Sequence, residues 1–384
     1  MSRHAGEESP CWQPTWAQAM TDFRGDDEEP PFDDLTIRMT VPASIGGSQL
    51  RLELSNRFGD APVLIGRGAV MVGDQTASIA FEGQRSTEIP VGASQWTDPI
   101  NLAVRHCDDV VVDLYLPGPT PYVTANGFRF DRAARPGDFV GSRSLATRDT
   151  SATPEPDGTD WSLPAGGPFL RTIEVAGDKA RAVIVALGAS STAMGWPQYT
   201  ADLLPAEARI AIVNRGIAGN RIRLDAPQSA SSWGRAGLSR FDEDVLETAG
   251  VTHVVIAYNS NDWGLPGRVT PVDEMPSASQ MVDSYQELVA RARAAGVQAV
   301  LATVMPLAPE LLADPAREGL RLTLNDWIRT SGHQFVDFDA AIRSETDPSR
   351  IAAKYAAPDD THPNVAGEKR LAQAMTGAIA LLHL

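Results

Sequence analysis

The hydrophobic positions of the chain follow two patterns, and one gives way to the other near residue 175. In the first part, short segments rich in β-branched, leucine or aromatic residues are separated by Gly, Pro, Asn and Asp, which is typical of strands joined by turns. Residues 50–54 alternate strictly between leucine and charge, which predicts a half-buried strand. Strands at this spacing favour a β-sandwich or jelly roll. They are predicted at 35–41, 49–54, 63–72, 110–115 and 122–130.

The second part alternates continuous apolar runs with helical patterns. Strands buried on both faces that alternate with helices indicate a parallel sheet covered by helices on each side. The clearest helices are predicted at 278–295 and 365–382, where apolar residues recur at helical spacing. The strands of this sheet are predicted at 182–187, 210–213, 254–258, 297–304 and 334–338.

The length of the chain agrees with two domains. It has 384 residues and a mass of 41.1 kDa, more than twice a typical domain of ~150 residues. With 43% hydrophobic and 21% charged residues, its composition is that of a globular protein. We expect a β-rich domain at residues 1–175 and an α/β domain at 176–384, with a polar surface loop at 146–167 before the boundary.

The charge of the chain argues against anionic partners. It has 33 Lys and Arg against 49 Asp and Glu, a net charge of −16, so neither nucleic acid nor a membrane surface is an expected partner. No apolar stretch approaches the ~20 residues of a membrane helix, and residues 1–8 lack the apolar core of a signal peptide, so we expect a cytoplasmic protein. The acidic run at 26–29 is expected to be a solvated loop.

Cysteine and histidine usage gives no sign of a disulfide framework or a metal site. Cys11 and Cys107 could form one disulfide at most, and we expect buried, reduced thiols. The six histidines show no ligand spacing, and no glycine-rich phosphate-binding motif follows a strand. The sequence therefore predicts neither a metal nor a bound cofactor.

Residues with catalytic potential follow the strands predicted in the second part. In an open parallel sheet, functional groups gather at the carboxyl ends of the strands. Loops after three strands carry Ser190, Gly219 and Asn261, and a loop ahead of the last helix carries Asp359 and His362. Because three positions separate this aspartate from the histidine, a turn can fold the carboxylate onto the imidazole.

These residue types together can perform acyl transfer, although each alone is common in turns. A serine hydroxyl is a weak nucleophile and needs a base whose tautomer is fixed by a third group, which His362 and Asp359 can provide. Attack on a carbonyl creates an oxyanion, and one preorganised donor is worth ~3–4 kcal/mol at that stage. Ser191 is the alternative nucleophile; Ser190 is favoured because it directly follows the Gly-x pair of the turn.

The ordered set of Ser, Gly, Asn and Asp-x-x-His, spanning 182–362, resembles the four blocks of the SGNH, or GDSL, hydrolase family. The resemblance implies a three-layer α/β/α domain behind an N-terminal β-sandwich that is jelly-roll-like. It also implies that Ser190 is the nucleophile, His362 the base and Asp359 the residue that orients it. The oxyanion hole would consist of the N–H groups of Ser190 and Gly219 and the side-chain amide of Asn261.

Two positions depart from the family pattern. Ala189 stands where the family usually has Asp, and Asn259 stands where it usually has Gly. Neither position belongs to the implied triad or hole, so we expect the chemistry to be retained. Asn259 is expected to narrow or repolarise the substrate site.

The two-domain layout resembles an actinobacterial branch of the family. That resemblance implies transfer of an aryl, salicylyl-like acyl group from a CoA thioester, as co-substrate, to a hydroxyl of a polyketide. The partners would then be a small-molecule acyl donor and a hydroxylated acceptor. Ester hydrolysis is the first alternative, and a non-catalytic glycan or small-molecule binder is the second. The oligomeric state is not predicted.

Aromatic and basic residues near the strand ends are candidates for substrate contacts. Tryptophans could wall the site, although packing beneath a loop is an equal alternative. Arginines could bind the phosphates of a CoA donor, with solvated residues or salt bridges as the alternative. The candidates are Trp196, Trp233, Trp263, Arg215, Arg221 and Arg223.

Overall fold

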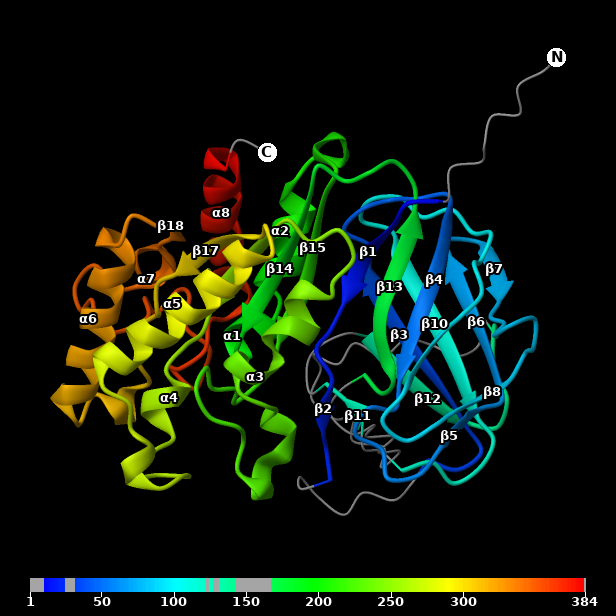
Figure 1. The fold of residues 1–384 in the computed structure, drawn as a ribbon, viewed down its shortest axis with the longest axis horizontal. Helices are drawn as coiled ribbons and strands as arrows, with labels where there is room; N and C mark the ends of the chain where they lie inside the picture. Colours follow the sequence, from blue (N-terminus) through cyan, green and yellow to red (C-terminus); the bar gives the residue numbers. More distant parts are fainter. Residues whose placement is uncertain (1–9, 25–31, 122–123, 127–130, 143–166, 383–384) are drawn as a thin grey trace.

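The computed structural model describes residues 10–24, 32–121, 124–126, 131–142 and 167–382 (Figure 1). The acidic run at 26–29, nearly all of the polar loop expected at 146–167 and most of the strand expected at 122–130 lie outside the described residues. So does the start of the chain, residues 1–8.

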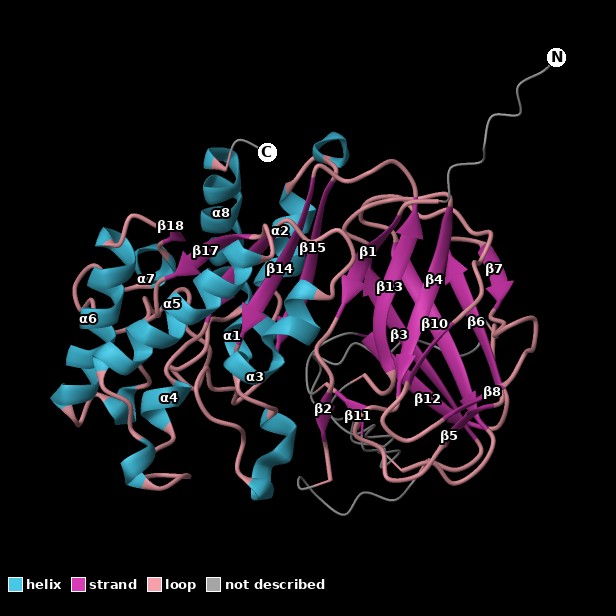
Figure 2. Cartoon of the chain, viewed as in Figure 1, coloured by secondary structure: helices cyan, strands magenta, loops and turns pink. Residues whose placement is uncertain are grey.

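The N-terminal part is a sandwich of two antiparallel sheets (Figure 2). One sheet has the strand order β1-β13-β4-β9 and the other the order β12-β3-β10-β6-β7. Two short ribbons, β2–β11 and β5–β8, lie at its edges. The bounds are β1 Trp12–Ala17, β2 Thr21–Asp22, β3 Leu35–Pro42, β4 Gln49–Ser55, β5 Val63–Ile65, β6 Arg67–Val72, β7 Gln75–Ser78, β8 Thr87–Ile89, β9 Ser94–Trp96, β10 Asp109–Leu116, β11 Thr124–Ala125, β12 Asp131–Pro136 and β13 Leu170–Ala176.

The two sheets share one apolar core. The leucines of β4 at positions 50, 52 and 54 are fully buried among inward-facing residues of the opposite sheet, as their alternation predicts. The charged face of β4 is only partly covered: the Arg51 side chain is 29% exposed, whereas Glu53 is buried. Glu53 is only 6% exposed and pairs with Arg171 at 2.9 Å. The guanidinium of Arg171 also donates to the carbonyl of Glu243 in the second domain.

The second part is an α/β domain around a parallel sheet of order β15-β14-β16-β17-β18. Its strands are β14 Ala182–Gly188, β15 Ile210–Gly216, β16 His253–Ala257, β17 Gln298–Ala302 and β18 Gln334–Val336. Its α-helices are α1 Ser190–Ala193, α2 Trp196–Leu203, α3 Gly237–Phe241, α4 Asn261–Gly264, α5 Ala278–Ala294, α6 Pro315–Thr330, α7 Phe338–Ile342 and α8 Val365–Leu381. Shorter helical segments are η1 Ala206–Ala208, η2 Gln228–Trp233, η3 Asp242–Leu246, η4 Val272–Glu274 and η5 Pro309–Leu311.

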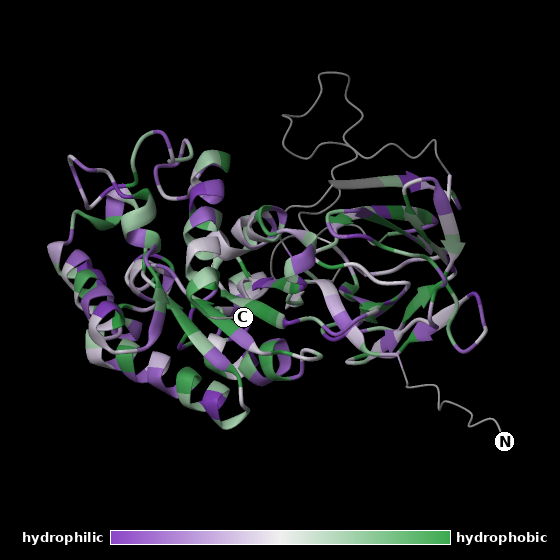
Figure 3. Ribbon diagram, turned by 90° about the horizontal axis from the view of Figure 1, so that it is seen from above, coloured by the Kyte–Doolittle hydropathy of each residue, from purple (hydrophilic) through white to green (hydrophobic). Residues whose placement is uncertain are grey.

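Alternate residues of the parallel strands face two helical layers. Val185 and Leu187 of β14 pack in one cluster with residues of α3, α5 and α6. Ile184 and Ala186 pack in another with residues of α2, α7 and α8. The predicted three-layer α/β/α architecture is therefore confirmed, and the hydropathy colouring of Figure 3 shows apolar strands between the helices.

Most predicted strands coincide with observed ones, with informative exceptions. The segment predicted as one strand at 63–72 is two strands, which are interrupted at Gly66. Several observed strands were not predicted: β1, whose pattern is interrupted by Pro14, β13, which lies at the expected boundary, and β2, β7, β8, β9 and β12. Only residues 177–181 separate β13 from β14. The division at 175/176 itself stays a prediction.

Two further expectations concern single residues and membranes. Cys11 and Cys107 are free but exposed, so the expectation that they are buried is wrong; Cys107 lies in a surface turn with φ of 64°. Among the described residues, no helix combines the length and the apolar character needed to cross a bilayer.

Candidate active site

Ser190 is the first residue of the short helix α1, which follows the interior strand β14. The turn depends on Gly188, because a Cβ there would lie 2.2 Å from Thr192 Oγ1 and 2.4 Å from the carbonyl oxygen of Ala257. This close approach folds the chain back onto the end of β16 and places Ser190 at the carboxyl edge of the sheet, 8% exposed. As the first residue of a helix, its N–H has no acceptor within that helix.

His362 joins Ser190 to Asp359 in a continuous line of hydrogen bonds. His362 Nε2 lies 2.9 Å from Ser190 Oγ, and His362 Nδ1 lies 2.7 Å from Asp359 Oδ2. A carboxylate against Nδ1 favours the tautomer that carries its proton there, which leaves Nε2 free to accept from the serine hydroxyl. The structure therefore brings together the three residues that the sequence analysis grouped.

The Asp359 carboxylate is held by its own turn. Its Oδ1 accepts the backbone N–H groups of Thr361 and His362, each at 3.0 Å. Partial burial raises the pKa of Asp359, but the hydrogen bonds from the His362 side chain and from these two N–H groups lower it by more, so the pKa lies below its usual value. Asp359 consequently remains ionised opposite the imidazole at neutral pH.

Gly219 lies in the segment that follows β15, and Asn261 is the first residue of α4, which follows β16. Gly219 has a φ of 72°, and the Asn261 side-chain amide donates to the carbonyl of Asn220 at 2.9 Å. This bond uses one amide hydrogen of Asn261 and leaves the second for another acceptor. Within the described part of the chain, the N–H groups of Ser190 and Gly219 have no acceptor. Both are available to a substrate oxygen.

Trp233 packs directly on Gly219. A Cβ at Gly219 would lie 2.3 Å from Cγ of the half-buried indole, so only glycine fits beneath the ring. The carbonyl of Trp233 also accepts from the Asn220 side-chain amide at 2.7 Å. Of the three tryptophans predicted near the site, Trp233 is the one that the structure places against a candidate oxyanion donor.

A buried carboxylate in α4 binds the segment 217–227, which follows β15 and is called the Gly219 loop below. This role was not predicted from the sequence. Asp262, 3% exposed, accepts the N–H groups of Ile222 at 2.9 Å and Arg223 at 3.2 Å. Burial raises the pKa of Asp262 to about 6, even though the two N–H groups oppose the shift. In the sequence, the position of Asp262 directly after Asn261 could have indicated a role at the site.

A buried arginine lies beneath the same loop and was also missed. Arg240 donates to the carbonyl of Gly188 at 3.0 Å, to the carbonyl of Arg215 at 2.8 Å and to the side chain of Asn220 at 3.1 Å. It pairs with buried Asp244 at 2.8 Å. Burial lowers the pKa of Arg240, but the neighbouring Tyr258 and Asp244 raise it by more, so the guanidinium stays charged. It thereby joins the ends of β14 and β15 to the Gly219 loop.

Trp196 and Trp263 do not line the site, and the prediction that they do is wrong. Trp196 is 1% exposed and packs edge-on against Phe338, with ring centroids 5.1 Å apart. Trp263 is fully buried in the core beneath α5 and α6. For both residues, the alternative prediction of ordinary packing beneath a loop agrees with the structure.

Two of the three arginines predicted to bind phosphate, Arg215 and Arg221, are buried with partners inside the protein, which corrects that prediction for them, whereas Arg223 is partly exposed. Arg215 is buried, donates to the carbonyl of Gln18 and has its pKa lowered by burial to about 10. Arg221 is 4% exposed and pairs with Glu274. Arg223 donates to α5 through the Gln280 carbonyl at 2.8 Å and the hydroxyl of Ser284 at 3.2 Å.

The two departures from the family pattern also have definite surroundings. Ala189 is completely buried, and its carbonyl accepts the N–H groups of Thr192 and Ala193 in the nucleophile turn. The side-chain oxygen of Asn259 is buried without a hydrogen-bond partner among the described residues. This oxygen lies at the carboxyl end of β16, between the strand and the loop that carries Asn261.

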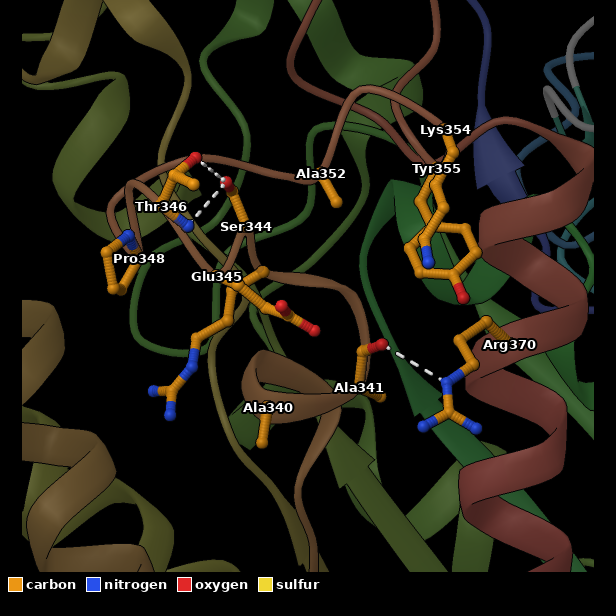
Figure 4. A pocket seen from close by; sticks show the side chains of 11 residues that line it. Ala340, Ala341, Ser344, Glu345, Thr346, Pro348, Ala352, Lys354, Tyr355 and Arg370 are labelled. Carbon is orange, nitrogen blue, oxygen red and sulfur yellow. Dashed lines mark hydrogen bonds between the residues drawn. The ribbon is translucent and has the colours of Figure 1, made fainter.

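Two cavities are lined by residues other than Ser190, His362 and Asp359. One, of about 840 Å³, lies between the domains and is lined by Asp22, Arg24, Gln228, Ser229 and Ser231. The other, of about 710 Å³, lies beside α7 and α8, where Figure 4 shows Tyr355 above Arg370, which donates to the carbonyl of Ala341. Neither Ser190 nor His362 is among the residues that line it. No cluster of metal-ligating side chains occurs in the part of the chain that the structure describes.

Solved structures similar to this chain cover about half of it. An acetylxylan esterase from Geobacillus stearothermophilus is 23% identical and covers 52% of this chain and 94% of its own, with a TM-score of 0.41. An aryl esterase from M. smegmatis is 15% identical, with coverage of 52% and 99% and a TM-score of 0.41. A carbohydrate acetylesterase from Sinorhizobium meliloti is 16% identical, with coverage of 53% and 100% and a TM-score of 0.40. Among curated proteins, none matches the chain.

The family model that matches is the GDSL-like Lipase/Acylhydrolase family. The match runs over residues 175–370, just over half of the chain, and so includes every strand of the parallel sheet and the loops that carry Ser190, Gly219, Asn261 and His362. The order of these four residues and the architecture around them agree with this match, and the chain belongs to the GDSL-like Lipase/Acylhydrolase family.

Proposed function

We propose that this protein hydrolyses esters through an acyl-enzyme formed on Ser190. The observation that carries the proposal is the line of hydrogen bonds from Ser190 Oγ through His362 to Asp359, with lengths of 2.9 and 2.7 Å. Membership in a lipase and acylhydrolase family supports the same class of reaction. The arrangement matches the requirement that a serine nucleophile have an adjacent base and that a third group orient this base.

The proposed reaction has two balanced halves. Ser190 Oγ attacks the ester carbonyl while His362 Nε2 takes its proton, and the alcohol then leaves with that proton. The oxyanion is stabilised by the N–H groups of Ser190 and Gly219 and by the second amide hydrogen of Asn261. Water then gives a proton to the imidazole, attacks the acyl-serine and releases the acid, which restores the Ser190 hydroxyl. Asp359 stabilises the imidazolium in both halves.

The test of this proposal compares two adjacent serines. Ser190→Ala is expected to lower kcat for p-nitrophenyl acetate by about 10³-fold or more, because both the nucleophile and its acyl intermediate are lost. Ser191→Ala is the matched control and should stay close to the wild type. A fluorophosphonate probe should label the wild type at Ser190, as read by mass spectrometry of the digested protein. Labelling of Ser191, or retained activity in Ser190→Ala, would show that the assignment is wrong.

The second candidate is acyl transfer, in which an alcohol replaces water. The observation that favours it is the 840 Å³ polar cavity between the domains, which borders η2, the segment that carries Trp233 over Gly219. A hydroxylated acceptor such as a polyketide could lie there, with an aryl-CoA thioester as the donor of a salicylyl-like group. This proposal requires contacts for the CoA phosphates other than Arg215 and Arg221, which are buried.

One incubation separates these candidates. The protein is given an aryl-CoA with and without a polyketide alcohol, and free acid and ester are followed by mass spectrometry. Ester that appears only with the alcohol supports transfer. Free acid at the same rate in both mixtures supports hydrolysis. If no activated ester gives an acyl-Ser190 adduct, the protein is a non-catalytic binder.

A further inference from the structure

The Gly219 loop, which follows β15, is contacted by a side chain of the N-terminal domain. Asn126 follows strand β11 of the N-terminal sandwich and is only 4% exposed. Its side-chain amide donates to the carbonyl of Ala19 at 2.7 Å and to the carbonyl of Gly216 at 3.1 Å. Gly216 is the last residue of β15, so a side chain of one domain binds the backbone of the other where the Gly219 loop begins.

The peptide group between Gly216 and Ile217 is fixed on both sides. Its carbonyl accepts from Asn126, and its N–H donates to the carbonyl of Gly188 at 3.2 Å, in the turn that precedes Ser190. Gly216 also packs against α1, since a Cβ there would lie 2.3 Å from the nitrogen of Ala193. The orientation of this peptide therefore depends on the nucleophile turn and on the N-terminal domain together.

A second contact from the same ribbon supports the other side of the loop. Strands β2 and β11 pair as Thr124 with Asp22, and the carbonyl of Asp22 accepts from the hydroxyl of Ser231 at 2.7 Å. Ser231 belongs to η2, which ends at Trp233, and the indole of Trp233 covers Gly219. The β2–β11 ribbon thus contacts both the start of the Gly219 loop and the segment that covers it.

We infer that the N-terminal domain forms part of the catalytic apparatus by orienting the Gly219 N–H, and that Asn126 is the positioning residue that does so. An oxyanion donor is effective only when it lies within hydrogen-bond distance of the developing charge, so a rotated peptide three residues before Gly219 weakens it. The inference rests on the function proposed above. It gives the accessory domain a role that does not depend on binding any ligand.

The experiment uses the full chain and removes only the donor. Asn126→Ala deletes the amide, and Asn126→Asp keeps the shape but replaces the donor by a carboxylate that repels the Gly216 carbonyl. Both variants should lower kcat for p-nitrophenyl acetate by about 10- to 100-fold, less than the loss of a whole oxyanion donor, while KM changes less than about twofold. Rates are expressed per serine titrated with a fluorophosphonate, so unfolded protein does not count.

Gln13→Ala is the matched control at the opposite end of the same interface. Gln13 is also buried, and its amide donates across the domain boundary to the carbonyl of Asp178 at 3.1 Å, near the start of β14. It should lower the melting temperature as Asn126→Ala does, yet leave kcat per titrated serine unchanged. Equal kcat values for the two alanine variants would overturn the inference. A wild type that neither turns over the ester nor labels at Ser190 would instead overturn the proposed function, and this inference with it.

Discussion

Gly219 occupies a position that excludes a side chain for two independent reasons. Its φ of 72° is in the left-handed region, where a Cβ meets the following carbonyl. The space a Cβ would need is filled by the indole of Trp233, 2.3 Å away. Any larger residue must displace the ring or rotate the peptide, and a rotated peptide shifts the N–H that we propose as an oxyanion donor.

We therefore expect Gly219→Ala to lower kcat for p-nitrophenyl acetate by about 10²- to 10³-fold per titrated serine, the cost of one oxyanion donor. Gly296→Ala is the matched control, because Gly296 has a φ of 75° but nothing within 4 Å of a Cβ. It should cost about 1 kcal/mol of folding free energy through strain, with kcat unchanged. If both variants lose activity equally, backbone strain and not donor placement is responsible.

At the scale of elements, the buried carboxylate of Asp262 joins α4 to the loop that carries Gly219. Asp262 of α4 accepts two N–H groups of the segment that follows Gly219. Burial raises its pKa to about 6, above the ~3.9 of an unfolded chain, so the folded state binds this proton more tightly. The ionised form therefore costs stability above pH 6, and protonation relieves that cost as the pH falls towards 4.

Asp262→Asn should remove this pH dependence. Between pH 7 and pH 5, the unfolding free energy of the wild type should rise relative to that of the variant by roughly 1 kcal/mol, because only the wild type takes up the proton. Urea unfolding followed by circular dichroism at the two pH values measures the difference, and other carboxylates cancel in it. If the difference in unfolding free energy between the wild type and Asp262→Asn does not change with pH, Asp262 is not the titrating group.

The strands and helices of the catalytic domain were predictable because they depend on local apolar periodicity. Residues 182–187 form a β-branched apolar run of strand length that ends in Gly188, and residues 278–295 have apolar residues at helical spacing. The grouping of Ser190, His362 and Asp359 was predictable because the order of serine, glycine, asparagine and Asp-x-x-His along the chain resembles a family pattern. The roles of Arg215 and Arg240 were not, because their partners come from distant segments: Gln18 lies 197 positions from Arg215. Local sequence does not distinguish a buried arginine from a ligand-binding one.

At the scale of the whole molecule, the two domains share a continuous interior. Ala180, Val183 and Ala211 of the second domain belong to the apolar core of the sandwich. Polar contacts reinforce this junction: the N–H of Ile212 in β15 donates to the hydroxyl of Ser44 at 3.2 Å, and Arg215 donates to Gln18. Separating the domains would expose apolar surface and leave these buried groups unpaired.

Differential scanning calorimetry of the wild type should therefore show a single transition. Arg215→Ala removes the donor to the carbonyl of Gln18 and should lower the transition temperature by several degrees, or split the transition into two. Arg209→Ala is the control, since Arg209 is half-exposed and its pair with Asp178 spans 3.8 Å, a contact worth at most ~1 kcal/mol. Two separate transitions in the wild type would contradict a shared interior.

The place of β13 in the sandwich has a consequence for the order of events during synthesis. Its residues, Leu170–Ala176, are the last of the N-terminal domain to be made, yet the strand lies between β1 and β4 inside its sheet. In a nascent chain that ends before β13, the edges of β1 and β4 that face β13 in the finished sheet therefore lack a partner. The next strand to emerge is β14, at the interior of the parallel sheet. An interior strand of each sheet is therefore synthesised in succession, and the N-terminal sheet has all of its strands only when β14 is about to be made.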